Sequence, residues 1–310
     1  MYRIGDGSNR YVPSVTTILG AVASEKSKRS LENWCINNPG KKEEACERGS
    51  AIHLCCERYV RGLNPDVPPE YADYWQGMEK HLCNIDDVLW SERPMLPKWR
   101  KITVADDGMP RIWSTDLLYS GTPDLVYKRD GMVILADYKT SSGPYCRHFP
   151  KDDPDRGKFT GWMKFQKVCK QLAAYSIAFE ETLGVKVDAC QVIVSTSEMT
   201  QNFYIQGSEF EKFKTKWQAD CNHFWHKITI GDLASGRPAE MALGEFDLTP
   251  ELQELLAAEQ ATTQAPMPDP VGTPVITQKS LLPSSMSHQG VASRPQPPKH
   301  QRLIKQLACA

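Results

Sequence analysis

The chain has 310 residues, of which 40% are hydrophobic and 24% are charged, and its formal net charge is −1. Residues 260–310 hold five Lys or Arg and one Asp, which leaves 32 positive and 37 negative residues before them and excludes a general basic surface for nucleic acid. The N-terminus has no charged-then-apolar leader and no run approaches ~20 apolar residues, so the sequence predicts a cytoplasmic protein without a membrane partner.

The residues from Lys41 to Arg61 are predicted to form a helix, because a Pro-Gly pair precedes them and a glycine follows them. His53 and Glu57 are four residues apart and therefore project from one face of this helix. The helix can present the His53 imidazole to a metal ion, although a solitary helical histidine is more often a core or surface residue. Glu57 is explained equally well as a partner for Arg61, four residues further on.

A strand and a hairpin are predicted next. The strand runs from Asp87 to Pro94 and carries Glu92. The hairpin runs from Asp124 to Asp137 with Lys128-Arg-Asp-Gly131 as its turn, because Asp-Gly is a strong hairpin dipeptide. Lys139 lies two residues after Asp137 and therefore shares one face of the strand with it. Two carboxylates and a lysine would converge here, which suits a hard divalent cation and an activated water.

The segment from Lys158 to Lys170 contains four lysines that alternate with aromatic residues, among them Trp162 and Phe165. Lysines contact phosphates and aromatic faces stack on unpaired bases, so the pattern suits single-stranded nucleic acid. Lys158, Lys164, Lys167, Trp162 and Phe165 are the candidate DNA-binding residues of this segment. The alternative is a helix entrance whose aromatic side chains enter the core while its lysines stay in water.

A helix is predicted from Met163 to Leu183, with Gln171 and Tyr175 four residues apart on one face. A second hairpin, from Ala189 to Ser197 and Asn202 to Gln206, and a helix from Ser208 to Ile228 follow. Helices, then strands that carry the site, then a helix, strands and a helix imply an α/β core with a mixed central sheet.

The composition changes after residue 259. From Gln260 to about Pro298 the chain is rich in Ala, Thr, Gln, Ser and Pro without hydrophobic periodicity, which predicts a disordered tail behind one domain of residues 1–259. The chain then ends in the basic stretch from Lys299 to Leu307, which could fold onto a protein partner or touch DNA.

Pro123-Asp124 followed by Asp137-Tyr138-Lys139 resembles the bipartite signature of the PD-(D/E)XK nuclease superfamily. Upstream of it lies the stretch Arg48-Gly-Ser-Ala-Ile-His-Leu-Cys-Cys-Glu57, and downstream lies Lys170-Gln-Leu-Ala-Ala-Tyr175. In that order they resemble the RecB-type branch, the exonuclease-like nucleases of recombination machines and many bacteriophages. The resemblance spans roughly Tyr11 to Ile228.

This resemblance implies a restriction-endonuclease-like core, in which a mixed central sheet is flanked by helices. It also implies a Mg²⁺- or Mn²⁺-dependent exonuclease that hydrolyses DNA from its ends in phage or bacterial recombination, replication or repair. DNA ends and single strands are then the expected partners, in the cytoplasm of a bacterial host if the chain is encoded by a phage.

The resemblance also assigns roles to residues of the site. His53, Asp124, Asp137 and the backbone carbonyl of Tyr138 would hold the metal ion, and Lys139 would orient or deprotonate the water and stabilise the developing charge. Asp124, Asp137 and Lys139 are the expected catalytic residues. The supporting candidates are Glu57 and Glu92, and the residues implied to hold the DNA backbone are Gln171 and Tyr175.

Two other functions are compatible with the same fold. A structure-specific or restriction-like endonuclease would use the same site. A non-catalytic DNA-binding protein would be expected to lose Asp or Lys first, whereas the full set of His53, Asp124, Asp137 and Lys139 is present. Some RecB-type relatives carry a four-cysteine iron–sulfur cluster, but no C-x-x-C occurs here, so no cluster is expected.

Overall fold

The hairpin predicted around the Asp-Gly dipeptide is present in the computed structural model, which describes residues 2–3, 11–85, 87–100, 108–150 and 156–234. Its strands are β7 (Leu125–Arg129) and β8 (Met132–Thr140), with Arg129 opposite Met132. Asp130 and Gly131 have φ angles of 51° and 78°, the left-handed pair that a tight hairpin turn requires. The turn therefore lies one residue later than predicted, because these two residues are its centre and not its end.

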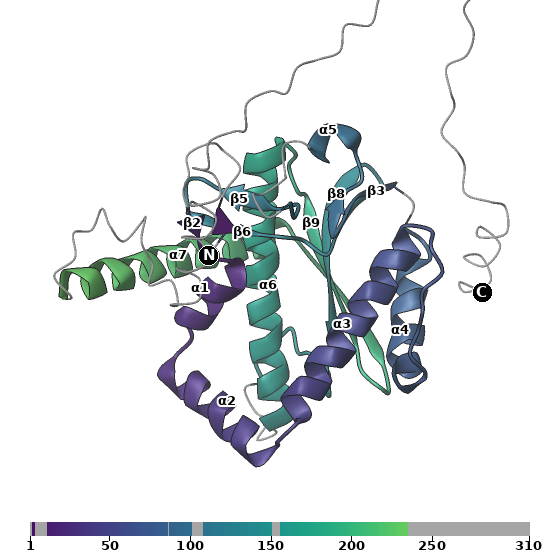
Figure 1. The fold of residues 1–310 in the computed structure, drawn as a ribbon, viewed down its shortest axis with the longest axis horizontal. Helices are drawn as coiled ribbons and strands as arrows, with labels where there is room; N and C mark the ends of the chain where they lie inside the picture. Colours follow the sequence, from purple (N-terminus) through teal and green to yellow (C-terminus); the bar gives the residue numbers. More distant parts are fainter. Residues whose placement is uncertain (1, 4–10, 86, 101–107, 151–155, 235–310) are drawn as a thin grey trace, which may run out of the picture. The chain divides into compact units, whose positions relative to one another are not determined.

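The hairpin belongs to a six-stranded sheet with the strand order β10-β9-β8-β7-β3-β4 (Figure 1). β8 and β9 are parallel, and the other neighbouring strands are antiparallel, so the sheet is mixed, as the sequence predicts. The other strands of this sheet are β3 (Asp87–Ser91), β4 (Arg93–Pro94), β9 (Ala189–Ser195) and β10 (Thr200–Gln206). Two small pairs lie outside it: β1 (Tyr2–Arg3) with β2 (Tyr11–Val12), and β5 (Ile112–Ser114) with β6 (Tyr119–Gly121).

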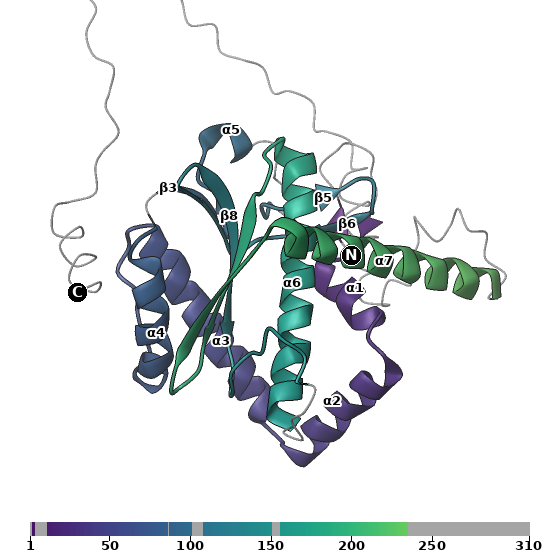
Figure 2. The ribbon, with the colours of Figure 1, turned by 180° about the vertical axis from the view of Figure 1, so that it is seen from behind.

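Helices cover both faces of this sheet (Figure 1). α3 (Lys41–Val60) and α4 (Ala72–Leu82) pack on one face, and α6 (Arg156–Leu183) packs on the other. Seen from behind, α7 (Gly207–Ala234) runs across α6 (Figure 2). The remaining helices are α1 (Val15–Ala21), α2 (Glu25–Asn37), the short 3₁₀ helix η1 (Pro69–Tyr71) and α5 (Pro97–Arg100). Among the described residues, no helix is both long and apolar enough to cross a membrane.

The side chains of β8 alternate between two buried clusters. Val133 and Leu135 pack with α6 and α7, whereas Ile134, Ala136 and Tyr138 pack with α3 and α4. Because successive residues of a strand face opposite sides, Asp137 and Lys139 belong to the α6 face. The central strand thus delivers its two charged residues between the sheet and one helix.

The predicted helix from Met163 starts earlier than the sequence indicates. α6 begins at Arg156, and the residues from Lys158 to Lys170 are therefore helical. Within this helix Phe165 is completely buried and packs against Phe203. The interpretation of Phe165 as a DNA-binding residue is therefore wrong, because its ring is part of the core. The predicted domain boundary at residue 259 and the tail from Gln260 lie outside the described residues.

Candidate functional site

The two strands of the hairpin separate at the two aspartates. Their pairing ends with Leu125 opposite Ala136, and Asp124 and Asp137 are the next residues on either strand. Asp124 Oδ2 accepts a hydrogen bond from the backbone N–H of Tyr138 at 3.0 Å, so a side chain replaces the next bond of the ladder. Both carboxylates consequently lie in the fork between β7 and β8.

The backbone at Asp124 is held against β3. The indole Nε1 of Trp90 donates to the carbonyl of Pro123 at 2.9 Å, and the N–H of Glu92 donates to the carbonyl of Asp124 at 3.0 Å. The sequence predicts Glu92 within a strand, but Glu92 lies in the turn between β3 and β4, with a φ of 55°. This left-handed turn ends the strand before Glu92 and brings its carboxylate to the fork.

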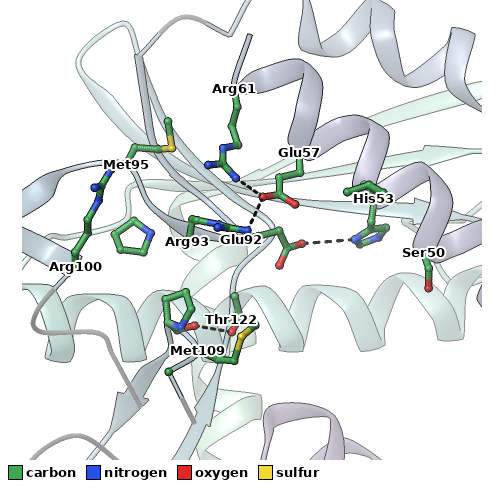
Figure 3. A pocket seen from close by; sticks show the side chains of 14 residues that line it. Ser50, His53, Glu57, Arg61, Glu92, Arg93, Met95, Arg100, Met109 and Thr122 are labelled. Atoms are coloured by element: carbon green, nitrogen blue, oxygen red, sulfur yellow. Dashed lines mark hydrogen bonds and ion pairs between the residues drawn. The ribbon is translucent and has the colours of Figure 1, made fainter. Parts of the chain in front are cut away.

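His53 reaches the fork from α3, as predicted. Its Nε2 donates to the carbonyl of Tyr138 at 2.7 Å, and its Nδ1 lies 3.5 Å from Asp124 Oδ2. The same Nδ1 lies 3.9 Å from Glu92 Oε1 (Figure 3). Burial is the largest influence on the pKa of His53 and lowers it, but Asp124 and Glu92 together outweigh burial and raise it to about 9. The fork therefore attracts positive charge.

Three side chains of the fork are arranged as a metal ion would need them. Ligand atoms of His53, Glu92 and Asp124 all lie within 4.8 Å of one another. Two carboxylates and an imidazole suit a divalent cation, and the raised pKa of His53 reflects the negative charge of these carboxylates. Glu92 thus belongs to the group of possible ligands, whereas the sequence indicates only a supporting role for it.

Asp137 and Lys139 form a second, buried part of the site. The Asp137 side chain is 1% exposed and forms an ion pair with Lys139. Burial raises the pKa of Asp137, although Lys139 opposes this. Burial lowers the pKa of Lys139, but Asp137 and Asp124 outweigh it and raise the pKa above its ordinary value. Without a metal ion, the two aspartates therefore favour the charged form of Lys139.

A pocket of about 820 Å³ opens beside the fork, and His53 and Glu92 form part of its wall (Figure 3). Glu57 does not join the metal-ligating group: it is ion-paired with Arg61 at 2.5 Å and with Arg93 at 3.5 Å. The sequence leaves open a role for Glu57 as a partner of Arg61, and the structure contains that contact. Nothing in the local sequence marks Arg93 as a lining residue, because it comes to the pocket through the turn at Glu92.

The polar residues of α6 lie at different depths. Gln171 Nε2 donates to the hydroxyl of Tyr175 at 3.2 Å, and the Tyr175 side chain is 6% exposed. Lys164 Nζ donates to Ser141 Oγ at 3.0 Å, and burial lowers the pKa of Lys167. Lys158, by contrast, is exposed.

Aromatic rings gather at the start of α6. The Trp162 ring lies 5.0 Å from that of Phe149 and 5.9 Å from that of Phe159, centroid to centroid. Phe149 and Phe159 are 50% and 46% exposed. These rings therefore form a surface cluster, unlike Phe165, which follows Trp162 by three residues and points into the core.

Comparison with known proteins identifies a family. The model of the PD-(D/E)XK nuclease superfamily matches residues 29–264, which is more than half of the chain. The comparison with curated proteins finds no match. Among solved structures, the chain is similar to one titled "Crystal structure of SSO0001", with 15% identity over 68% of this chain and 74% of that one and a TM-score of 0.29.

Proposed function

The chain belongs to the PD-(D/E)XK nuclease superfamily, and we propose that it is a RecB-type exonuclease that hydrolyses DNA from its ends with Mg²⁺ or Mn²⁺. The observation that carries this proposal is the fork, where Asp124, Asp137 and Lys139 lie beside His53 from α3. The Gln171–Tyr175 pair on α6 supports the RecB-type assignment, because it follows the catalytic strand in the order typical of that branch.

His53, Glu92 and Asp124 would hold the cation, joined by Asp137 and the carbonyl of Tyr138. A bound divalent cation supplies positive charge for the pentacoordinate phosphate and lowers the pKa of a bound water. His53 Nε2 now donates to the Tyr138 carbonyl at 2.7 Å, so a cation held by both atoms would replace the proton between them. Glu57 would not contact the cation but would hold Arg61 and Arg93 at the pocket wall.

The proposed role of Lys139 is that of a cation. Without a bound cation the pKa of Lys139 is raised, so the ammonium can donate a hydrogen bond to the attacking water or to the phosphate. Its ion pair with Asp137 fixes its position on β8. Lys139 would therefore orient the water and stabilise the charge that develops on the phosphate.

Attack at DNA ends is tested by comparing two forms of one plasmid. We expect Mg²⁺-dependent release of nucleotides from end-labelled linear DNA and no loss of the covalently closed circle, since an exonuclease needs an end. A version in which Lys139 is replaced by alanine controls for contaminating nucleases. Rapid nicking of the closed circle would favour an endonuclease, and binding of both forms without hydrolysis would favour a non-catalytic protein.

The surface rings at the start of α6 are proposed to stack on unpaired bases. Trp162→Ala and Phe159→Ala are each expected to weaken binding of a single-stranded oligonucleotide by ~1–3 kcal/mol per stacked base. Binding of a fully paired duplex of the same length should change less, because its bases are already stacked. Fluorescence anisotropy with both ligands measures this, and equal losses for the two ligands would contradict stacking.

A further inference from the structure

The parallel strands β8 and β9 end side by side, next to the catalytic lysine. Thr140, the residue after Lys139, lies opposite Ser195, and the N–H of Ser141 donates to the carbonyl of Ser195 at 3.0 Å. Ligands of sheets with parallel strands bind beyond the carboxyl ends of those strands. This edge is therefore a place where a substrate of the neighbouring site can extend.

Helices from opposite faces of the sheet meet at this edge. α3 approaches through Gly49, where a Cβ atom would lie 3.9 Å from Thr140 Oγ1. α6 approaches through Lys164, whose Nζ bonds to Ser141 Oγ at 3.0 Å. Arg48, the residue before Gly49, is thus on one side of the strand end and Lys164 is on the other.

Arg48 is largely buried, and its Nε lacks a hydrogen-bond partner. The residue is 9% exposed, and the guanidinium carbon lies 4.8 Å from the centroid of the Tyr74 ring. The carboxylate that interacts with its charge is that of Glu44, an exposed residue one turn earlier on α3, whose pKa Arg48 helps to lower. Buried charges in proteins are normally paired, because an unpaired one is costly to remove from water.

Lys164 brings a second positive charge near Arg48. Burial lowers the pKa of Lys164, and the neighbouring Arg48 lowers it further. Two cations therefore lie near each other at this edge, and a bound phosphate would reduce their mutual repulsion. A guanidinium is planar and can donate two parallel hydrogen bonds to two oxygens of a phosphate, and an ammonium adds a compact charge beside it.

We propose that Arg48 and Lys164 form a subsite for one backbone phosphate of the bound DNA strand. This inference rests on the proposed function and adds to it a fixed point for the strand beyond Lys139. Thr140 follows Asp137 by three residues, or about 10 Å at ~3.3 Å per residue. At about 3.4 Å of rise per nucleotide, the phosphate lies within about three nucleotides of the cleaved bond.

The test removes the charge of this contact in the DNA and, separately, in the protein. A set of oligonucleotides carries a single uncharged methylphosphonate linkage at successive positions, and binding is measured in Ca²⁺ without Mg²⁺ or Mn²⁺. For the wild-type protein we expect about tenfold weaker binding at one linkage within three nucleotides of the cleaved bond. For Arg48→Met and for Lys164→Met, that linkage should cause little further loss, because its partner is already gone.

Lys186→Met is the matched control, because Lys186 is exposed and follows the far end of α6. This variant should keep the full tenfold penalty. Equal penalties in wild-type protein and Arg48→Met would overturn the subsite. Hydrolysis with Mg²⁺ is measured separately. If binding is weakened at one linkage in the wild-type protein and not in Arg48→Met, but the wild-type protein does not cleave, the exonuclease is refuted and the phosphate subsite stands.

A stability measurement separates binding from a structural role. Because Arg48→Met removes a largely buried charge whose Nε has no hydrogen-bond partner, its thermal midpoint without DNA should equal or exceed that of the wild type. A midpoint lower by several degrees would mean that Arg48 stabilises the fold itself, and this result would overturn the proposal.

Discussion

Lys139→Ala is expected to hydrolyse linear DNA at least ~10³-fold more slowly than the wild-type protein in Mg²⁺. Lys139 is the cation of the fork on β8, and a preorganised charge at the reacting phosphate contributes several kcal/mol to the transition state. The substitution leaves His53, Glu92 and Asp124 in place, so metal binding should persist. Single-turnover hydrolysis of an end-labelled duplex measures the effect.

The control for this loss is Lys128→Ala. Lys128 is an exposed lysine on the neighbouring strand β7, and its removal should leave the rate within about twofold. Because Lys139→Ala leaves Asp137 buried without its ion pair, circular dichroism must show that the variant is folded. A folded Lys139→Ala protein that cleaves within tenfold of the wild-type rate would remove Lys139 from the mechanism.

Local signals account for the parts of the fold that the sequence predicts. The Asp-Gly dipeptide identifies the β7–β8 hairpin, and the glycines around residues 41–61 mark both ends of α3. His53 can be placed near the aspartates because the family motifs occur in a known order. The distances that bring His53, Glu92 and Asp124 together depend on three separate elements, which no local pattern contains.

The sequence predicts the start of α6 at Met163 and not at Arg156, because the first turns of the helix lack an apolar stripe. Lysines and exposed aromatic rings alternate there, and the helical continuation from Arg156 becomes evident only from its packing. For the same reason the sequence predicts one role, DNA binding, for both Phe165 and Trp162. They are three residues apart on one helix and differ in direction by about 60° around its axis. This difference places the Phe165 ring in the core and leaves the Trp162 ring beside the exposed Phe149 and Phe159.

Glu92 and Arg48 show a second limit of sequence reasoning. Glu92 reads as part of a strand, but the left-handed turn at Glu92 separates β3 from β4 and directs its carboxylate to the fork. Arg48 is one of 37 Lys and Arg residues, and its burial against Tyr74 follows from the packing of α3 against α4. Both are tertiary properties.

Asp124→Asn is expected to cause a comparable loss of activity through the metal. The asparagine keeps an oxygen that can accept the N–H of Tyr138, so the fork should keep its shape, but the ligand loses its charge. Loss of residues outside the ligand set costs 10–100-fold in metal affinity, so loss of this ligand charge should cost at least ~10²-fold. Isothermal titration with Mn²⁺ measures the affinity.

The pKa of His53 provides a test that is independent of catalysis. Without metal, Asp124 is the strongest influence that raises the pKa of His53 to about 9, so Asp124→Asn should lower it toward 6.5, as followed by NMR. Asp188→Asn is the matched control, because Asp188 also accepts a backbone N–H of β8, that of Val133 at 2.9 Å, but at the opposite end of the strand. Asp188→Asn should leave both the His53 pKa and the Mn²⁺ affinity unchanged. If Asp124→Asn also left both values unchanged, Asp124 would not be part of the metal site.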